Sequence, residues 1–266
     1  MLIAAENISL EVPDMGHQVL WGQRRSLRIL KDVSVSVGRG ETVGIVGESG
    51  SGKTSLGRTL LRLYEPSAGR IRFDGADITH LPQVLLKPFR RRMQMIFQDP
   101  QSSLNPRHTI GGILGGAMRF HGLEAGEKTL AAIVERVGLP AQALRHYPHQ
   151  LSGGQRQRVG IARAMALRPE FVVADEIVSG LDASTQAQVL DLLKGLRDEF
   201  GLSLAFISHD LSVVRHICDR IIIMRAGEVV EAGDVAATFA APKSDFTRSL
   251  IAAIPLPEPD ETWLQR

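Results

Sequence analysis

The sequence has little cysteine, few aromatic residues and no excess of charge of either sign. Its single cysteine, Cys218, excludes an internal disulfide and any cysteine-ligated cluster held within the chain. We expect this thiol to be buried and inert. The 31 lysines and arginines are balanced by 29 aspartates and glutamates, so no long-range field points to a nucleic acid as a partner.

Long hydrophobic runs are also missing. No stretch of about 18 apolar residues occurs, so we expect no membrane-spanning segment. The first seven residues lack a basic region followed by an apolar stretch, and no secretory signal is expected. With 44% hydrophobic residues the chain can still form one large core. We therefore expect a cytoplasmic protein that is peripheral to a membrane only through another chain.

Short apolar stretches alternate with longer helical ones, which predicts an α/β fold with a mostly parallel sheet between helices. Four apolar runs predict buried strands: Thr42–Val46, Met93–Phe97, Phe171–Ala174 and Leu204–Ile207. Polar residues follow each of these runs. Because ligands of open α/β sheets bind at the carboxyl ends of the strands, we expect these polar residues to form one shared site.

Other parts of the chain differ from this pattern. Residues 99–168 begin with glycine, proline and asparagine and then become helical from 128 to 137, which predicts an inserted helical lobe. Residues 221–231 have the pattern of a hairpin around an Arg-Ala-Gly turn. We interpret the basic run 90–92 as a solvated face or a contact for another protein.

A glycine-rich loop follows the first predicted strand. It consists of Gly47, Glu48, Ser49, Gly50, Ser51, Gly52, Lys53 and Thr54. This G-x-x-x-x-G-K-[ST] pattern between a strand and a helix presents backbone N–H groups and the positive helix end to phosphates. We expect all eight residues to bind ATP, Lys53 to reach the β- and γ-phosphates, and the Thr54 hydroxyl to bind Mg²⁺. The alternative is a purely structural glycine turn.

Two adjacent carboxylates, Asp175 and Glu176, end the third predicted strand. Carboxylates at the end of a buried strand need a cation or a chemical role. Asp175 suits the Mg²⁺ shell, and Glu176 suits the general base that polarises the attacking water. Alone this pattern is weak, but together with the glycine-rich loop it indicates ATP hydrolysis.

A second anion-binding motif consists of Ser152, Gly153, Gly154 and Gln155. The S-x-x-Q spacing predicts a capping box at the start of a helix over 156–167, with Arg163 among the residues that supply charge away from its apolar face. One nucleotide does not need two phosphate-binding helix ends from the same chain. We therefore expect this helix end to bind the nucleotide held by a partner subunit across a two-fold interface.

These motifs, in this order, closely resemble the ATP-binding cassette (ABC) family over nearly the whole chain. The resemblance implies a P-loop NTPase (RecA-like) parallel-sheet core, an N-terminal antiparallel β subdomain and an inserted helical subdomain at about 99–168. It also implies that Gln98 touches Mg²⁺ or the attacking water, that Asp182 binds nucleotide and communicates across the dimer, and that His209 holds the γ-phosphate. The implied catalytic residues are thus Glu176, His209 and Gln98.

Within the family the chain looks most like the second, "F-type" ATPases of oligopeptide, dipeptide and nickel importers. Residues 97–107, 146–150 and 246–255 carry this similarity. The resemblance implies an ATPase domain over 1–240 and a C-terminal extension over 241–266. It also implies a second ATPase subunit (identical or a paralogue), two transmembrane permease subunits, and indirectly a periplasmic or extracellular solute-binding protein, at the cytoplasmic face of a bacterial membrane.

The leading function is therefore to energise the import of a solute, peptides or nickel. One alternative is the ATPase of a soluble assembly, such as a phosphonate-cleaving complex. A DNA-maintenance or ribosome-associated cassette is another, but the chain has neither a long coiled-coil insertion nor a second cassette.

Three positions depart from the family pattern. Ile177 replaces the usual proline after the carboxylate pair, and Gly180 replaces a common alanine, which adds freedom at the dimer seam. The aromatic residue that stacks on adenine should lie near Val12, where there is no ring; Trp21 is an alternative source of one.

Overall fold

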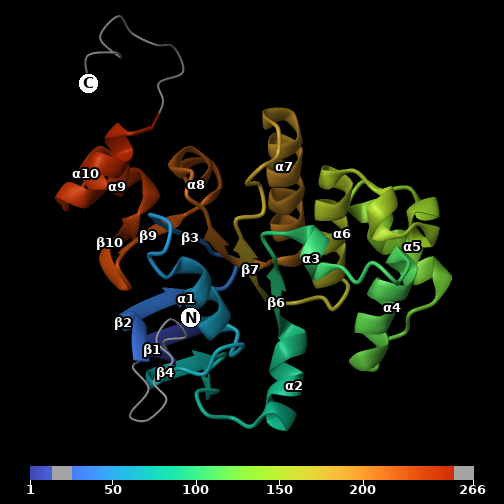
Figure 1. Cartoon of the computed structure of the whole chain (residues 1–266), viewed down its shortest axis with the longest axis horizontal. Coiled ribbons are helices and arrows are strands. Elements are labelled where there is room, and N and C mark those ends of the chain that lie inside the picture. The colour runs from blue at the N-terminus through green and yellow to red at the C-terminus, as the bar shows by residue number, and fades with distance from the viewer. Residues whose placement is uncertain (14–25, 255–266) are drawn as a thin grey trace, which may run out of the picture.

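The computed structural model describes residues 1–13 and 26–254 (Figure 1). The larger of its two sheets has the strand order β10-β9-β3-β8-β7-β6, and only β10, at the edge, runs antiparallel to its neighbour. Its strands are β3 (Thr42–Gly47), β6 (Met93–Ile96), β7 (Phe171–Asp175), β8 (Ser203–Ile207), β9 (Arg220–Arg225) and β10 (Glu228–Asp234). The four buried strands and the hairpin predicted from the sequence are confirmed.

The smaller sheet is antiparallel and has the order β2-β1-β4-β5. Its strands are β1 (Ile3–Pro13), β2 (Ser26–Val37), β4 (Ala68–Phe73) and β5 (Ala76–Asp77). In β2, Val33, Val35 and Val37 are buried while the residues between them are more exposed. This alternation directs one face of the sheet to the core. The antiparallel N-terminal unit implied by the resemblance is therefore present.

Ten α-helices and two short 3₁₀ helices lie between or after the strands in the described part of the chain. They are α1 (Lys53–Leu60), α2 (Gln83–Arg92), α3 (Pro100–Ser103), α4 (Ile110–Phe120), α5 (Glu127–Arg136), η1 (Ala141–Arg145), η2 (Pro148–Gln150), α6 (Gly153–Met165), α7 (Ala183–Phe200), α8 (Leu211–Ile217), α9 (Val235–Ala240) and α10 (Asp245–Ala252). In Figure 1, α4, α5 and α6 lie together on the side of the molecule away from the antiparallel sheet.

The large sheet has an apolar layer on each face, because successive residues of a strand point to opposite sides. In β7, Phe171 and Val173 belong to the layer shared with α1 and the antiparallel sheet. Val172 and Ala174 belong to the layer shared with α4, α5, α6 and α7. Burial on both faces explains why the sequence of β7 is continuously apolar.

An ion-pair network fastens the two sheets together. The Arg92 guanidinium contacts Glu170 at 2.5 Å and Asp74 at 2.6 Å, and Arg39 contacts the same two carboxylates. These hydrogen bonds raise the pKa of Arg92 and lower the pKa of both Asp74 and Glu170. The expectation of a solvated face did not include these ion pairs: the Arg92 side chain stays about one-third exposed, and its carboxylate partners come from other segments of the chain.

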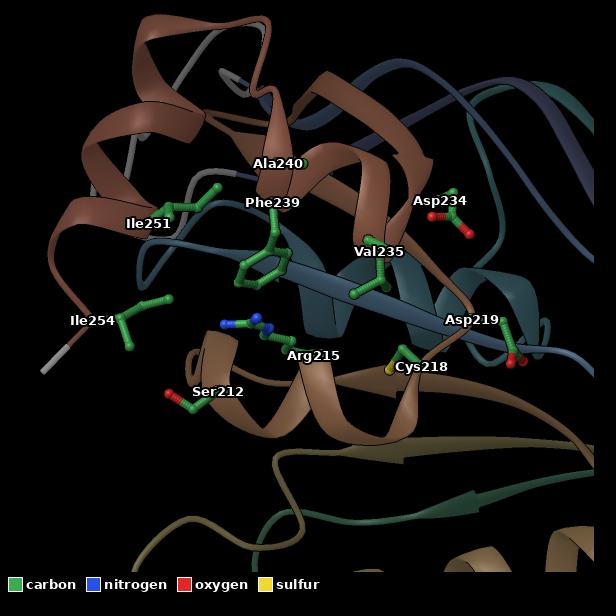
Figure 2. Close-up of a pocket in the computed structure, with 11 residues that line it drawn as sticks. Ser212, Arg215, Cys218, Asp219, Asp234, Val235, Phe239, Ala240, Ile251 and Ile254 are labelled. Atoms are coloured by element: carbon green, nitrogen blue, oxygen red, sulfur yellow. The ribbon is translucent and has the colours of Figure 1, made fainter. Parts of the chain in front are cut away.

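The C-terminal helices enclose a groove of about 870 Å³ against α8 (Figure 2). Arg215 lies there beneath the ring of Phe239, with 5.5 Å between the guanidinium carbon and the ring centroid. Cys218 also lines the groove and is half-buried rather than buried as expected. Its desolvation raises the pKa of the thiol, so the thiol stays protonated at neutral pH. This groove contains none of the residues predicted to bind nucleotide.

Candidate active site

The glycine-rich loop joins the end of β3 to the start of α1. Gly47 has a φ of +151°, and a Cβ atom there would lie 2.1 Å from the carbonyl oxygen of Met224. Gly52 has a φ of +98° and is the N-cap of α1. Both positions require glycine, the first for the close approach of β9 and the second for its left-handed backbone.

The Lys53 ammonium group lies inside the loop. Its Nζ donates hydrogen bonds of 2.8 Å to the carbonyl oxygens of Gly47 and Glu48. Burial lowers the pKa of Lys53, while the charges of Glu176 and Asp175 act in the opposite direction. The loop therefore holds a cation beside the amino-terminal end of a helix, which is an environment suited to phosphate oxygens.

Thr54 and Asp175 form the contact between the loop and β7. The Thr54 hydroxyl donates a 2.9 Å hydrogen bond to Oδ1 of Asp175. Asp175 is buried, with 2% of its surface exposed. Desolvation raises the pKa of this carboxyl group, and the hydrogen bond from Thr54 opposes the shift. A hydroxyl and a buried carboxylate without an ion-pair partner among the described residues are oxygen donors of the kind that Mg²⁺ prefers.

Glu176 lies where the ends of β6, β7 and β8 meet. Its Oε2 accepts a 3.0 Å hydrogen bond from the Gln98 amide and lies 3.5 Å from Nδ1 of His209. Its φ of +45° is uncommon for a residue other than glycine. The structure thus brings together Gln98, Glu176 and His209, which lie far apart in the sequence, as the strand-end argument predicted.

The second anion-binding motif caps α6 as predicted. Ser152 Oγ accepts a hydrogen bond from the Gln155 amide at 3.3 Å, and Gln155 Oε1 accepts one from the Ser152 amide at 2.9 Å. A Cβ on Gly154 would lie 2.7 Å from Cγ2 of Thr185, whereas a Cβ on Gly153 would have no neighbour within 4 Å. The start of α6 therefore packs against the start of α7.

Asp182 is the N-cap of α7. Its carboxylate accepts a 3.0 Å hydrogen bond from the Thr185 amide and a 2.7 Å bond from the Thr185 hydroxyl. These bonds lower the pKa of Asp182. Within this chain Asp182 thus has a helix-capping function, and its expected function across a dimer interface remains a prediction.

The helices α1 and α6, whose amino-terminal ends carry the two anion-binding motifs, lie apart in the folded structure. In Figure 1, α6 lies with α4 and α5, on the far side of β6 and β7 from α1. Among the described residues, no hydrogen bond or ion pair joins the capped end of α6 to Lys53, Thr54, Asp175 or Glu176. This separation is what the two-subunit prediction requires.

The three positions that depart from the family pattern have different surroundings in the structure. Val12 is half-buried in β1, where its partner in β2 is Leu27, and Trp21 lies outside the described residues. Gly180 has a φ of +76°, so the loop has a shape that glycine adopts at little cost. Ile177 is 1% exposed and belongs to the apolar layer of α6 and α7.

Sequence reasoning missed the environment of Arg163. The expectation that it supplies charge away from the apolar face of α6 does not describe its surroundings. Its guanidinium donates to the Ser103 carbonyl and lies over the ring of Phe97. No local signal distinguishes it from other arginines of α6, because both contacts come from a distant segment.

Comparison with known proteins decides the family. The family profile described as ABC transporter matches residues 30–179. This chain belongs to the ABC transporter family. A putative peptide import ATP-binding protein of Brucella ovis is 52% identical over 239 residues, covering 88% of this chain and 75% of its own. The oligopeptide transport ATP-binding protein OppF of Bacillus subtilis is 46% identical, covering 89% and 79%.

Solved structures agree with this assignment. A dimeric ATP-binding cassette in a post-hydrolysis state, bound to ADP and Pi, superposes with a TM-score of 0.77 at 30% identity, covering 88% of this chain and 98% of its own. The ABC protein described here is therefore an ATPase with the predicted P-loop fold. None of the helices in the described ranges combines the length and hydrophobicity needed to cross a bilayer.

Proposed function

We propose that this ABC ATPase energises the import of peptides through a membrane permease, as one of two ATPase subunits. The names of its relatives, which are peptide and oligopeptide import ATP-binding proteins, support peptides over nickel and over a soluble assembly. The observation that carries the ATPase part of the proposal is the convergence of Gln98 and His209 on Glu176, beside the contact of Thr54 with Asp175. In this assembly the chain lies at the cytoplasmic face of the membrane, and a solute-binding protein delivers the peptide.

The eight residues of the glycine-rich loop bind the ATP phosphates, with Lys53 on the β- and γ-phosphates. Thr54, Asp175 and Gln98 hold Mg²⁺, which, when bound, neutralises charge on the phosphate oxygens. Glu176 orients the attacking water and accepts its proton, while His209 donates a hydrogen bond to the γ-phosphate. The amide of Gln98 fixes the Glu176 carboxylate in place.

A partner ATPase completes each site. Ser152, Gly153, Gly154 and Gln155 of the facing subunit bind the γ-phosphate, and Asp182 contacts the partner. The charge of the γ-phosphate holds the two subunits in the closed dimer. Hydrolysis removes that charge and lets the subunits separate, so the cycle shifts the population between closed and open dimers. The helical lobe and residues 97–103, the Gln98 loop, transmit this motion to the permease.

Peptide uptake tests the proposal. In a strain without this gene, uptake of a labelled oligopeptide should fall to background, and the wild-type gene should restore it. E176Q should not restore it at equal protein level. Labelled nickel uptake serves as the matched control and should be unchanged. Loss of nickel uptake with normal peptide uptake would identify nickel as the cargo. Normal uptake of both would contradict a function in the import of either.

A further inference from the structure

Arg163 is a half-buried cation on α6 that faces the segment containing Gln98. Its Nη1 donates a 2.5 Å hydrogen bond to the carbonyl oxygen of Ser103, and its guanidinium carbon lies 5.5 Å from the centroid of the Phe97 ring. Burial lowers the pKa of Arg163, and no carboxylate of residues 1–13 or 26–254 opposes this shift. A cation held without an ion pair needs another explanation.

The two contacts lie on either side of Gln98. Phe97 immediately precedes it, and Ser103 is the last residue of α3. Gln98 in turn donates its amide to Glu176. One side chain of α6 thus contacts both ends of the loop whose amide holds the Glu176 carboxylate.

An arginine side chain can make both of these contacts at once. A guanidinium can donate hydrogen bonds in its plane while its face lies on an aromatic ring. A lysine has one ammonium group and lacks the planar fork, and a methionine can fill the space without donating a hydrogen bond. Both contacts of Arg163 therefore depend on its guanidinium.

We propose that Arg163 is a positioning residue for ATP hydrolysis, which fixes the Gln98 loop against α6 and thereby sets the place of Gln98 beside Glu176. The inference rests on the proposed role of Gln98. The same helix begins at the Ser152 cap, so a displacement of α6 also displaces the Gln98 loop. The end that grips the partner's nucleotide is in this way tied to the chain's own hydrolytic residues.

A double-mutant cycle on the full chain tests this coupling. R163M should lower kcat for ATP about tenfold or more, because small displacements in a site are costly. Its affinity for a non-hydrolysable ATP analogue should stay within about twofold of wild type, since the glycine-rich loop is untouched. R163M combined with Q98A should be no slower than Q98A alone.

Arg158 provides the matched control. It lies on the same helix but donates to the Val137 carbonyl and to Gln188, away from the Gln98 loop. R158M should leave kcat near the wild-type value. Combined with Q98A, it should change kcat by the same small factor as it does alone, because the two sites are independent. R163K, which keeps the charge, should have a kcat between wild type and R163M; it replaces R163M in the cycle if R163M does not fold.

The outcomes separate two failures. Wild-type kcat in R163M, or effects of R163M and Q98A that multiply as for the control, would overturn the positioning role. Wild-type kcat in Q98A would instead overturn the role of Gln98 on which this inference rests.

Discussion

The Thr54 hydroxyl and the Asp175 carboxylate are joined by a hydrogen bond of 2.9 Å, although the two residues are 121 positions apart in the sequence. The bond links the helix that follows the glycine-rich loop to the end of β7. It places two oxygen atoms suited to Mg²⁺ in contact, next to the Lys53 ammonium group and the Glu176 carboxylate. This contact is the basis for the first prediction.

T54V should lower Mg²⁺-dependent ATP hydrolysis about 100-fold or more. Valine keeps the shape of threonine but removes the hydroxyl, and metal assistance contributes several kcal/mol to such reactions. The measurement is the ATPase rate as a function of Mg²⁺ concentration. T59V on the same helix is the control, because the Thr59 hydroxyl donates to the Ser55 carbonyl of the same helix and not to Asp175. Equal ATPase rates in the two variants would contradict the assignment of Thr54 as an Mg²⁺ ligand.

E176Q should bind ATP but hydrolyse it at least about 100-fold more slowly, since glutamine cannot accept the proton of the attacking water. The chain should then accumulate as an ATP-filled pair. Gel filtration with and without ATP measures this association. A second substitution, S152A, removes the side-chain cap of α6 and should weaken the association of the two subunits. Association that is independent of ATP would contradict the shared site.

G154A should destabilise the fold by about 1–3 kcal/mol, because its methyl group would overlap Cγ2 of Thr185. T185S removes that methyl group and keeps the hydroxyl that binds Asp182, so G154A combined with T185S should recover part of the loss. G153A is the control and should cost less, because nothing lies within 4 Å of its Cβ. Urea unfolding measures all three. No rescue by T185S would show that the cost has another origin.

E170Q should lower stability at neutral pH but not in acid. The hydrogen bond from Arg92 holds the pKa of Glu170 below its ordinary value of 4.5. A depressed carboxyl pKa stabilises the folded state above the ordinary value, and this contribution is lost as the pH falls through the lowered one. Because the pair is partly exposed, we expect a difference of at most about 1 kcal/mol.

Urea unfolding from neutral pH to pH values below about 4.5 measures the E170Q effect, since urea does not screen charges as added salt does. E135Q, on the exposed face of α5, is the control and should show a smaller difference at neutral pH. A difference between wild type and E170Q that grows in acid would contradict the ion-pair argument.

The sequence predicted the elements that depend on local pattern. The apolar runs gave the strands β3, β6, β7 and β8, and the spacing of Ser152 and Gln155 gave the capping box. It could not predict contacts between distant segments. The pairing of Arg92 with Glu170 and Asp74, and the burial of Arg163 against Phe97, depend on the packing of several elements at once.

By itself, the sequence determined the strand–loop–helix phosphate motif, the carboxylate pair and the capped helix, because glycine torsions, apolar runs and capping act within a few residues. Only the tertiary structure decided which of these side chains meet. Parallel strands bring Gln98, Glu176 and His209 to one edge of the sheet. The inserted lobe carries Ser152 away from Lys53, because α6 packs against α4, α5 and α7 rather than against α1.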